Sequence, residues 1–231
     1  MKFFSPFGPK FLQLQLQDDI RIKLLDCVNQ LRQSPSKTIG KWSPNTPEEQ
    51  DAAQKNSIVD GEMILITPTD QEKHENIIAD IITDLIKLYA YKLYEDQETE
   101  YEETEYEYLL TDCWYVVLKS GDFHMLHSHK RNDDIFSVGQ LAGSIYLDIP
   151  ENLPHPQGVI EWVFTGATDN LSNSSCEFSP KSGDVVLWPS WLRHHVYPFR
   201  SNKERIMISF NGIWGEHMNV KHIKEEYKET E

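Results

Sequence analysis

The sequence predicts a mainly β protein whose N-terminal part is helical. Two segments with apolar residues at helical spacing, about Asp19–Gln33 and Ile77–Tyr89, come first along the chain. From Leu109 onward, short β-branched and aromatic runs alternate with Gly, Pro, Asn and Asp, which favour turns. Many short strands joined by polar turns indicate a barrel or sandwich. We expect one domain over 1–231, with a helical support region and acidic linker in 1–108, a β core in 109–215 and a charged tail in 216–231.

The first two helices each have a strand before them. Phe11–Gln17 alternates apolar and polar residues, as a half-buried strand does, and Asp18 and Asp19 stand where helix caps belong. Met63–Thr67 reads as a second strand. The helix over Ile77–Tyr89 has a wide apolar stripe, so we expect it to lie flat on a sheet.

An acidic run, Glu95–Glu107, separates the helical part from the β part. Eight of its thirteen residues are Asp or Glu, and burying them together would be costly. We therefore expect a solvated linker at the periphery, with a hairpin as the alternative. The β part then contains six candidate strands: Cys113–Lys119, Leu141–Asp148, Val159–Phe164, Asp184–Trp188, His195–Phe199 and Arg205–Ile213.

Composition limits the function classes. Hydrophobic residues make up 39% of the 231 residues, which indicates a folded globule. The net charge of −15 disfavours nonspecific binding to nucleic acid or to anionic membranes. No apolar run approaches the roughly 18 residues that a membrane helix needs. The three cysteines, Cys27, Cys113 and Cys176, lie far apart and indicate free thiols in a reducing compartment. The expected location is the cytoplasm, or the host cytoplasm if the protein is viral.

Three histidines have the spacing of a metal site. Alternate residues of a strand point to one face, so His127 and His129 can bind the same ion. His194 follows a Gly and Pro turn after a later strand and is a candidate for the third ligand. Its neighbour His195 should point to the opposite face. Neutral imidazole suits Fe, Zn, Cu and Ni.

Six segments carry a resemblance to a known family, and they occur in the family's order: His127-Ser128-His129, Leu141–Leu147, Gly158–Ile160, Pro180–Asp184, Pro189–His194 and Arg205–Asn211. From about Trp114 to Ile213 the chain resembles the 2-oxoglutarate and Fe(II)-dependent oxygenases of phages and marine bacteria, relatives of the prolyl hydroxylases. The resemblance implies a double-stranded β-helix, or jelly roll, braced by helices.

The resemblance also implies an activity and roles for five residues. The protein would be a dioxygenase that hydroxylates its substrate with Fe(II), 2-oxoglutarate and dioxygen. The ligand positions of the family match His127, His129 and His194. The arginine that binds the distal carboxylate of 2-oxoglutarate matches Arg205, and a tyrosine that assists it matches Tyr146.

The sequence departs from the common family pattern at two positions. His129 stands where a carboxylate ligand is usual, so Asp133, Asp134 and Glu161 are candidates to complete the set. Met207 stands where Ser is frequent, and Ser209 on the same strand face could substitute for it. Three tryptophans are candidates either for lining the approach to the metal or for the aromatic core: Trp162, Trp188 and Trp191.

Two other function classes fit the same histidines. The spacing around Gly121–Asp133 and Gly183–His194 also resembles the two cupin motifs, which would give a metal enzyme, an isomerase or another dioxygenase, without 2-oxoglutarate. A binding module of the same fold without activity is the third class. The substrate stays open between a prolyl or other amino-acid residue in a peptide, a free amino acid, a nucleotide and a small metabolite. A homo-oligomer is also left open.

Overall fold

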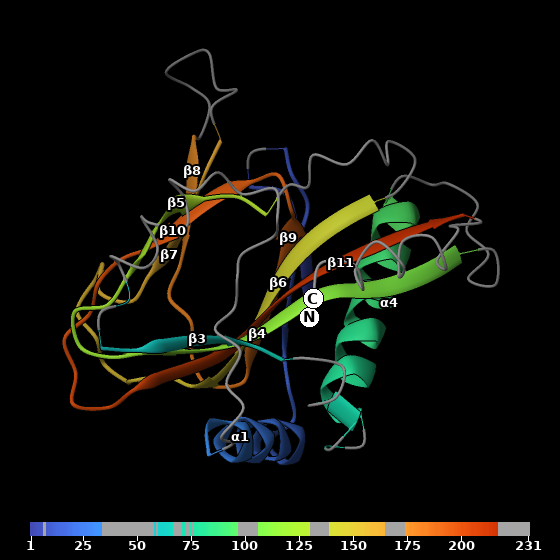
Figure 1. Cartoon of the computed structure of the whole chain (residues 1–231). Helices are drawn as coiled ribbons and strands as arrows, with labels where there is room; N and C mark the ends of the chain where they lie inside the picture. Colours follow the sequence, from blue (N-terminus) through green and yellow to red (C-terminus); the bar gives the residue numbers. More distant parts are fainter. Residues whose placement is uncertain are drawn as a thin grey trace.

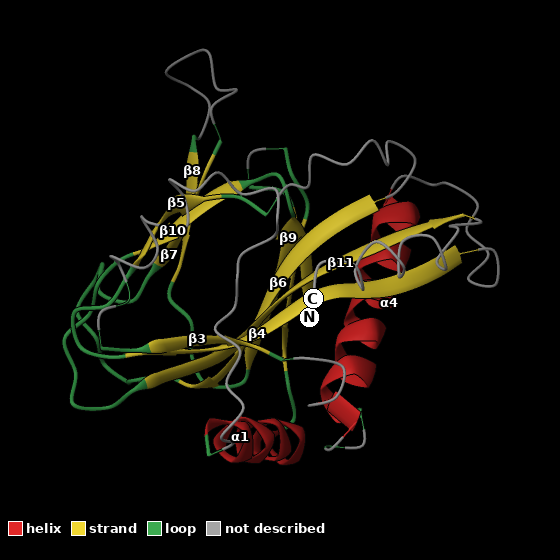
Figure 2. Cartoon of the chain, in the orientation of Figure 1, coloured by secondary structure: helices red, strands yellow, loops and turns green. Residues whose placement is uncertain are grey.

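The computed structural model describes residues 1–6, 8–33, 58, 60–66, 71–72, 74, 76–96, 106–129, 139–164 and 174–216. Two β-sheets face one another, and two helices lie outside the larger one (Figures 1 and 2). Within these ranges, no helix has the length and apolar character needed to cross a membrane.

Eight strands form the double-stranded β-helix, and most successive strands alternate between the two sheets. The four-stranded sheet has the order β5-β10-β7-β8, and the larger sheet contains β9-β6-β11-β4 as neighbours. All pairs are antiparallel. The strands are β4 (Tyr106–Leu118), β5 (His124–His127), β6 (Gly139–Asp148), β7 (Ile160–Val163), β8 (Ser175–Phe178), β9 (Asp184–Pro189), β10 (Arg193–Val196) and β11 (Arg205–Glu216). The predicted jelly roll is confirmed.

The N-terminal part contributes strands as well as helices to the fold. β1 (Lys2–Phe4) pairs with β2 (Phe11–Gln15), and β2 pairs with β9 at one edge of the larger sheet. β3 (Glu62–Leu65) pairs with β4 at the other edge. The larger sheet therefore has seven strands. These additions cover edges that would otherwise expose unpaired backbone groups.

Two helices, α1 (Asp18–Arg32) and α4 (Ile77–Asp96), pack on the outer face of the larger sheet (Figure 2). Their buried residues form one core with alternate residues of the strands, such as Ile208 and Phe210 of β11. The other face of the same strands contributes to a second core between the sheets, which includes Met207. The period-2 pattern of each strand thus sorts its side chains between the two cores.

The aromatic residues of the second core surround the histidines. Trp114, Trp162 and Trp188 are each 1% exposed and pack between the sheets. Trp191 differs, because 45% of its side chain is exposed and it contacts Phe164. Trp162 and Trp188 thus pack in the core, whereas Trp191 lies at the surface.

Several predicted boundaries shift. The strand expected at His195–Phe199 is instead Arg193–Val196, since Pro198 cannot donate to a ladder and Val196 is the last paired residue. Three strands, β1, β5 and β8, were not among the candidates; each has only three or four residues. β4 begins at Tyr106 and α4 ends at Asp96, so both ends of the acidic run lie in regular elements. Residues 97–105 lie outside the described part of the chain, as does most of the charged tail.

Candidate metal centre

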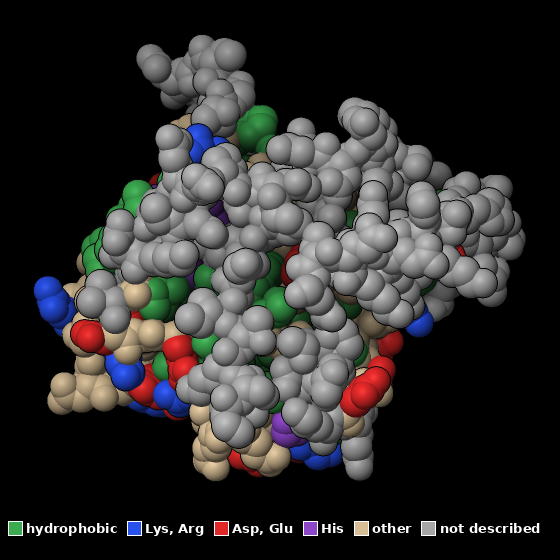
Figure 3. All heavy atoms as spheres, viewed as in Figure 1, with side chains coloured by type: hydrophobic (Ala, Val, Ile, Leu, Met, Phe, Trp, Pro, Cys, Tyr) green, Lys and Arg blue, Asp and Glu red, His purple; other side chains and the backbone are tan. Residues whose placement is uncertain are grey.

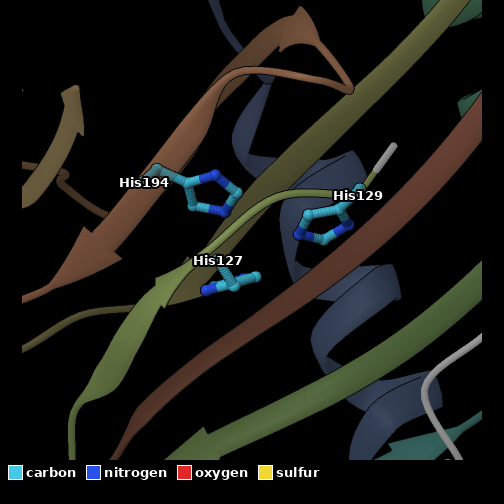
Figure 4. Close-up of side chains that lie close together, drawn as sticks. All are labelled: His127, His129 and His194. Carbon is cyan, nitrogen blue, oxygen red and sulfur yellow. The ribbon is translucent and has the colours of Figure 1, made fainter. Parts of the chain in front are cut away.

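The structure brings His127, His129 and His194 together between the two sheets. Their rings point toward one another in Figure 4, and their ligand nitrogens all lie within 4.8 Å of one another. Three nitrogens that share one metal ion, each about 2.0–2.1 Å from it, lie ~2.9–3.6 Å apart for bond angles of about 90–120°. The most distant nitrogens of the set therefore need to approach by roughly 1–2 Å to hold an ion.

Strand pairing places these three side chains. His127 and His194 are partners in the ladder between β5 and β10, and their ring centroids are 4.3 Å apart. His129 follows the end of β5, where its backbone N–H donates to the carbonyl of Ser190 at 2.9 Å. That bond ties the segment after β5 to the turn between β9 and β10. The His-x-His pair and the distant histidine are thus fixed by backbone hydrogen bonds.

The Nδ1 atom of each imidazole lies within hydrogen-bond distance of an oxygen acceptor. The acceptors are Met125 O for His127 at 2.6 Å, Leu192 O for His194 at 3.1 Å, and Asn211 Oδ1 for His129 at 2.8 Å. An oxygen acceptor requires a proton on Nδ1, so the lone pair resides on Nε2. Metal-binding histidines are oriented in this way in general. All three residues thus present the atom that binds a metal.

Burial keeps these rings neutral. It lowers the pKa of His127 to about 4 and, together with the charge of His127, the pKa of His129 to about 3. The edge of His129 is partly exposed, but its Nε2 atom is inaccessible to solvent. Burial also lowers the pKa of His194. Near neutral pH the set is therefore in the unprotonated form that can bind a metal.

A fourth histidine, His124, lies in the same pocket, although its place in the sequence does not predict a role. The residues that line the pocket are Met63, Trp114, Val116, His124, His127, His129, Ser144, Ile160, Trp188, His194, Val196, Met207 and Ser209. Val196 pairs with His124, and His194 pairs with His127. Between these two pairs the chain advances by three residues on β5 but by only two on β10. This bulge turns His124 to the same face as His127, against simple alternation. A bulge cannot be recognised in the sequence.

The other candidate ligands are placed elsewhere. His195 lies across β10 from His194, and its Nε2 is 3.3 Å from a carboxylate oxygen of Glu161. Glu161 also accepts a hydrogen bond of 2.6 Å from the Tyr197 hydroxyl, which lowers the pKa of its carboxyl group. Its side chain thus lies with His195 on the other face of the small sheet and does not complete the ligand set. Asp133 and Asp134 lie outside the described residues.

Arg205 and Tyr146 form a buried polar pair on neighbouring strands of the larger sheet. Both side chains are 0% exposed, and the guanidinium carbon lies 5.4 Å from the centroid of the Tyr146 ring. Arg205 Nη1 donates to the carbonyl of Gly158. Within the described part of the chain, no acid pairs with Arg205, and its guanidinium interacts with the Tyr146 hydroxyl, which also interacts with Ser144. A buried cation without an anion is costly, so this pair has the chemistry of an anion site.

β11 connects the anion site to the histidines. Arg205, Met207, Ser209 and Asn211 are spaced by two residues and therefore share one face of the strand. Met207 and Ser209 line the histidine pocket, and Asn211 bonds to His129. Ser209 also lies beside Ser144 of β6, with hydroxyl oxygens 3.4 Å apart. One strand face thus leads from a buried cation to a candidate metal ligand.

This part of the chain matches a known family model. Residues 112–211, which contain every residue of the pocket except Met63, match the model described as "Putative 2OG-Fe(II) oxygenase". Over these residues the chain is similar to the 2OG-Fe(II) oxygenases. The three-histidine set and the buried arginine fit the two groups that give this family its name, Fe(II) and 2-oxoglutarate. The family match favours an oxygenase over a cupin.

Solved structures show that the oxygenase fold extends beyond the matched segment. A prolyl-4-hydroxylase from Pseudomonas putida is 16% identical, with a TM-score of 0.53 over 90% of this chain and 92% of that one. A prolyl hydroxylase from Trichoplax adhaerens, in complex with a peptide fragment of hypoxia inducible factor, is 16% identical, with a TM-score of 0.58 over 92% and 86%.

A third solved structure of the same fold is a carbocyclase. SnoK, a non-heme alpha ketoglutarate dependent carbocyclase from nogalamycin biosynthesis, is 11% identical, with a TM-score of 0.58 over 93% of this chain and 85% of that one. At these identities the likeness concerns the fold alone. No curated protein is significantly similar in sequence.

Proposed function

We propose that this oxygenase hydroxylates a C–H bond of a peptide or small molecule. The overall reaction consumes the substrate, 2-oxoglutarate and dioxygen, and it yields the hydroxylated substrate, succinate and carbon dioxide. Bound Fe(II) would supply the activation of dioxygen, and the protein supplies positioning, charge and a dry pocket. In this proposal His127, His129 and His194 bind the iron through Nε2, and Arg205 and Tyr146 bind 2-oxoglutarate.

The buried pair of Arg205 and Tyr146 carries the proposal. A structural arginine at 0% exposure would be expected to have an acid beside it, yet no acid pairs with Arg205 in the described ranges, and its side-chain partner is the neutral Tyr146 hydroxyl. A carboxylate offers two oxygens to a guanidinium fork, and the Tyr146 hydroxyl can donate to the same group. A dicarboxylate that also reached the histidines would satisfy both ends of this β11 face. A cupin-type metal enzyme without 2-oxoglutarate has no need of such a pair.

The surroundings of the pocket support oxidative chemistry. Trp114 and Trp188 lie edge-on to His129 and His194, with ring centroids 6.1 and 5.0 Å apart respectively. These rings and Val116, Ile160 and Met207 make most of the pocket wall apolar. A low-dielectric wall strengthens the hold of Arg205 on an anion and excludes water from the reacting centre.

We propose a prolyl residue in a peptide as the first substrate to test. Two solved structures of this fold are prolyl hydroxylases, and one of them is in complex with a peptide fragment. The surface near the site is suitable for an apolar segment, because Met125, Leu126 and Trp191 are 43%, 40% and 45% exposed. Figure 3 shows hydrophobic side chains reaching the surface over the small sheet. The carbocyclase shows that this fold also supports other oxidative outcomes, so the product must be identified directly.

The test begins with binding of 2-oxoglutarate to the Fe(II)-loaded protein under anaerobic conditions. Chelation should produce a charge-transfer absorption band. Hydrogen bonds to charged groups contribute about 1.5–3 kcal/mol, so Arg205→Ala should weaken 2-oxoglutarate roughly 10- to 150-fold. Iron affinity should change little, because Arg205 is not a ligand. Arg205→Lys should recover only part of the loss, since an ammonium group cannot reproduce the fork.

Turnover then tests the reaction class. Admission of oxygen should convert 2-oxoglutarate to succinate, and a proline-containing peptide library should gain one oxygen atom per productive turnover by mass spectrometry. An absent band in the wild-type protein, or unchanged affinity in Arg205→Ala, would remove the role of Arg205 and favour the cupin alternative. Succinate formation without oxygen in any product would favour another oxidative outcome.

A further inference from the structure

Asn211 and Asp112 continue the hydrogen bonding of His129 away from the pocket. Asn211 Oδ1 lies 2.8 Å from His129 Nδ1, and Asn211 Nδ2 donates to Asp112 Oδ2 at 3.2 Å. Asn211 and Asp112 are ladder partners on β11 and β4, so the sheet holds them side by side. Thr111 Oγ1 donates to the same Asp112 oxygen at 3.1 Å. His129, which follows β5, is thus connected through Asn211 of β11 to Asp112 of β4.

The chemistry of this chain allows one arrangement of protons. An ionised carboxylate only accepts hydrogen bonds, so the amide of Asn211 must turn its NH₂ toward Asp112. Its carbonyl oxygen then faces His129 and requires a proton on Nδ1. With that proton fixed, the lone pair of His129 lies on Nε2, toward His127 and His194. The carboxylate therefore determines which nitrogen of His129 is the ligand.

The position of the chain matters because His129 stands where a carboxylate ligand is usual in the family. An all-histidine set contributes no negative charge to a divalent ion. Asp112 is the carboxylate joined to this set through a single intervening side chain, and Asn211 transmits its orientation. Ligands whose outer partners are carboxylates or carbonyls become more basic and better oriented.

We propose that Asp112 and Asn211 are positioning residues that set the tautomer of His129 and supply the charge that the missing carboxylate ligand would have given. This inference rests on the proposed function, because it concerns the same metal site. Neither residue touches the ion or the substrate. Their effect should therefore be seen in metal binding and in the protonation of His129, before any turnover.

The experiment measures metal affinity and the His129 tautomer separately. Co(II) affinity is obtained by titration against a competing chelator, and ¹⁵N NMR of the Zn(II)-loaded protein distinguishes a protonated from a metal-bound ring nitrogen. Loss of an outer-shell partner typically costs 10–100-fold in metal affinity, so Asn211→Leu should weaken Co(II) by roughly this factor. Asp112→Asn should weaken it less, by about tenfold, because an amide at 112 can keep the contact without the charge.

A swap of the two residues provides the rescue test. In Asp112→Asn/Asn211→Asp, the carboxylate would accept from His129 Nδ1 and from the new amide, so the same tautomer and the charge are both retained. Affinity should return to at least the wild-type value, with His129 Nδ1 protonated. Glu161→Gln is the matched control, since it removes one charge from the other face of the small sheet. The Co(II) affinity of Glu161→Gln should stay within about twofold of the wild-type value, a smaller change than the loss of an outer-shell partner causes.

The outcomes separate the two proposals. Wild-type protein that binds neither Co(II) nor Zn(II) would overturn both the metal site and the relay, that is, the proposed role of the chain from Asp112 through Asn211 to His129. Wild-type binding that Asn211→Leu leaves unchanged would overturn the relay alone. The relay would also fail if the swap did not restore affinity while the variant melted like the wild-type apo protein. An equal loss of Co(II) affinity in Glu161→Gln would show that the overall charge of the protein determines the affinity. That outcome would also reject the relay.

Discussion

His127 and His194 are ladder partners on β5 and β10, and their ring centroids are 4.3 Å apart. His195, the next residue along β10, contacts Glu161 instead. Two adjacent histidines thus lie on opposite faces of one strand, one in the pocket and one outside it. This pair offers a matched comparison within a single strand.

We predict that His194→Gln loses metal binding and that His195→Gln keeps it. Removal of one of three ligands should cost more than the roughly 10–100-fold that follows loss of an outer-shell partner. Co(II) titration of both variants, with circular dichroism as the control for folding, checks the prediction. Comparable affinities in the two variants would contradict the assignment of His194 as a ligand.

Tyr146→Phe should weaken 2-oxoglutarate and slightly destabilise the protein without ligands. The hydroxyl of Tyr146 is buried and interacts with Arg205 and Ser144. Its loss should lower the free energy of unfolding by roughly 1 kcal/mol. One neutral hydrogen bond contributes about 0.5–1.5 kcal/mol, so 2-oxoglutarate affinity should fall roughly 2- to 12-fold. Urea unfolding and anaerobic titration measure the two effects; unchanged 2-oxoglutarate affinity would remove the Tyr146 hydroxyl from the anion site.

The metal-free protein should be destabilised by mild acid. The pKa values of about 4 for His127 and about 3 for His129 lie below the usual value near 6.5, so the unfolded chain binds more protons in this window. Their contribution to stability is fully present above about pH 6.5 and is lost as the pH falls toward 4 and then 3. Melting temperatures from pH 7.5 to 4.5 should decline, and less steeply in His127→Gln.

Gly158→Ala should disturb the anion site, whereas Gly121→Ala should not. Both glycines have positive φ, at 70° and 101°, so alanine is strained at each. A Cβ on Gly158 would lie 3.2 Å from Arg205 Nη1 and 3.1 Å from Leu153, but at Gly121 the nearest atom is 3.8 Å away. Both variants should lose about 1 kcal/mol or more of stability. Only Gly158→Ala should also weaken 2-oxoglutarate binding in the anaerobic titration. If both variants bound 2-oxoglutarate equally well, the position of Arg205 would not depend on Gly158.

Much of the β core could be predicted, because its information is local. Alternation and turn residues located six of the eight strands of the β part, although β10 was shifted and β5 and β8 were not among the candidates. The His-x-His spacing and the distant His194 gave the candidate ligands, since ladder geometry places alternate residues on one face. Short or half-polar strands such as β1 and β8 have too little apolar pattern to be recognised, and they form only because neighbouring strands offer partners.

The sequence by itself determined the residue types of the site: three histidines, a β-strand arginine and a tyrosine, in the order that resembles the oxygenases. Only the tertiary structure decided that Glu161 lies outside the pocket and that His124 lies inside it. A single bulge in β5 reverses the expected face of His124, and it depends on pairing with β10. The link from Asp112 through Asn211 to His129 was equally beyond the sequence, because it joins residues 99 and 82 positions apart. Contacts between strands depend on register and pairing, which are properties of the folded sheet and not of local sequence.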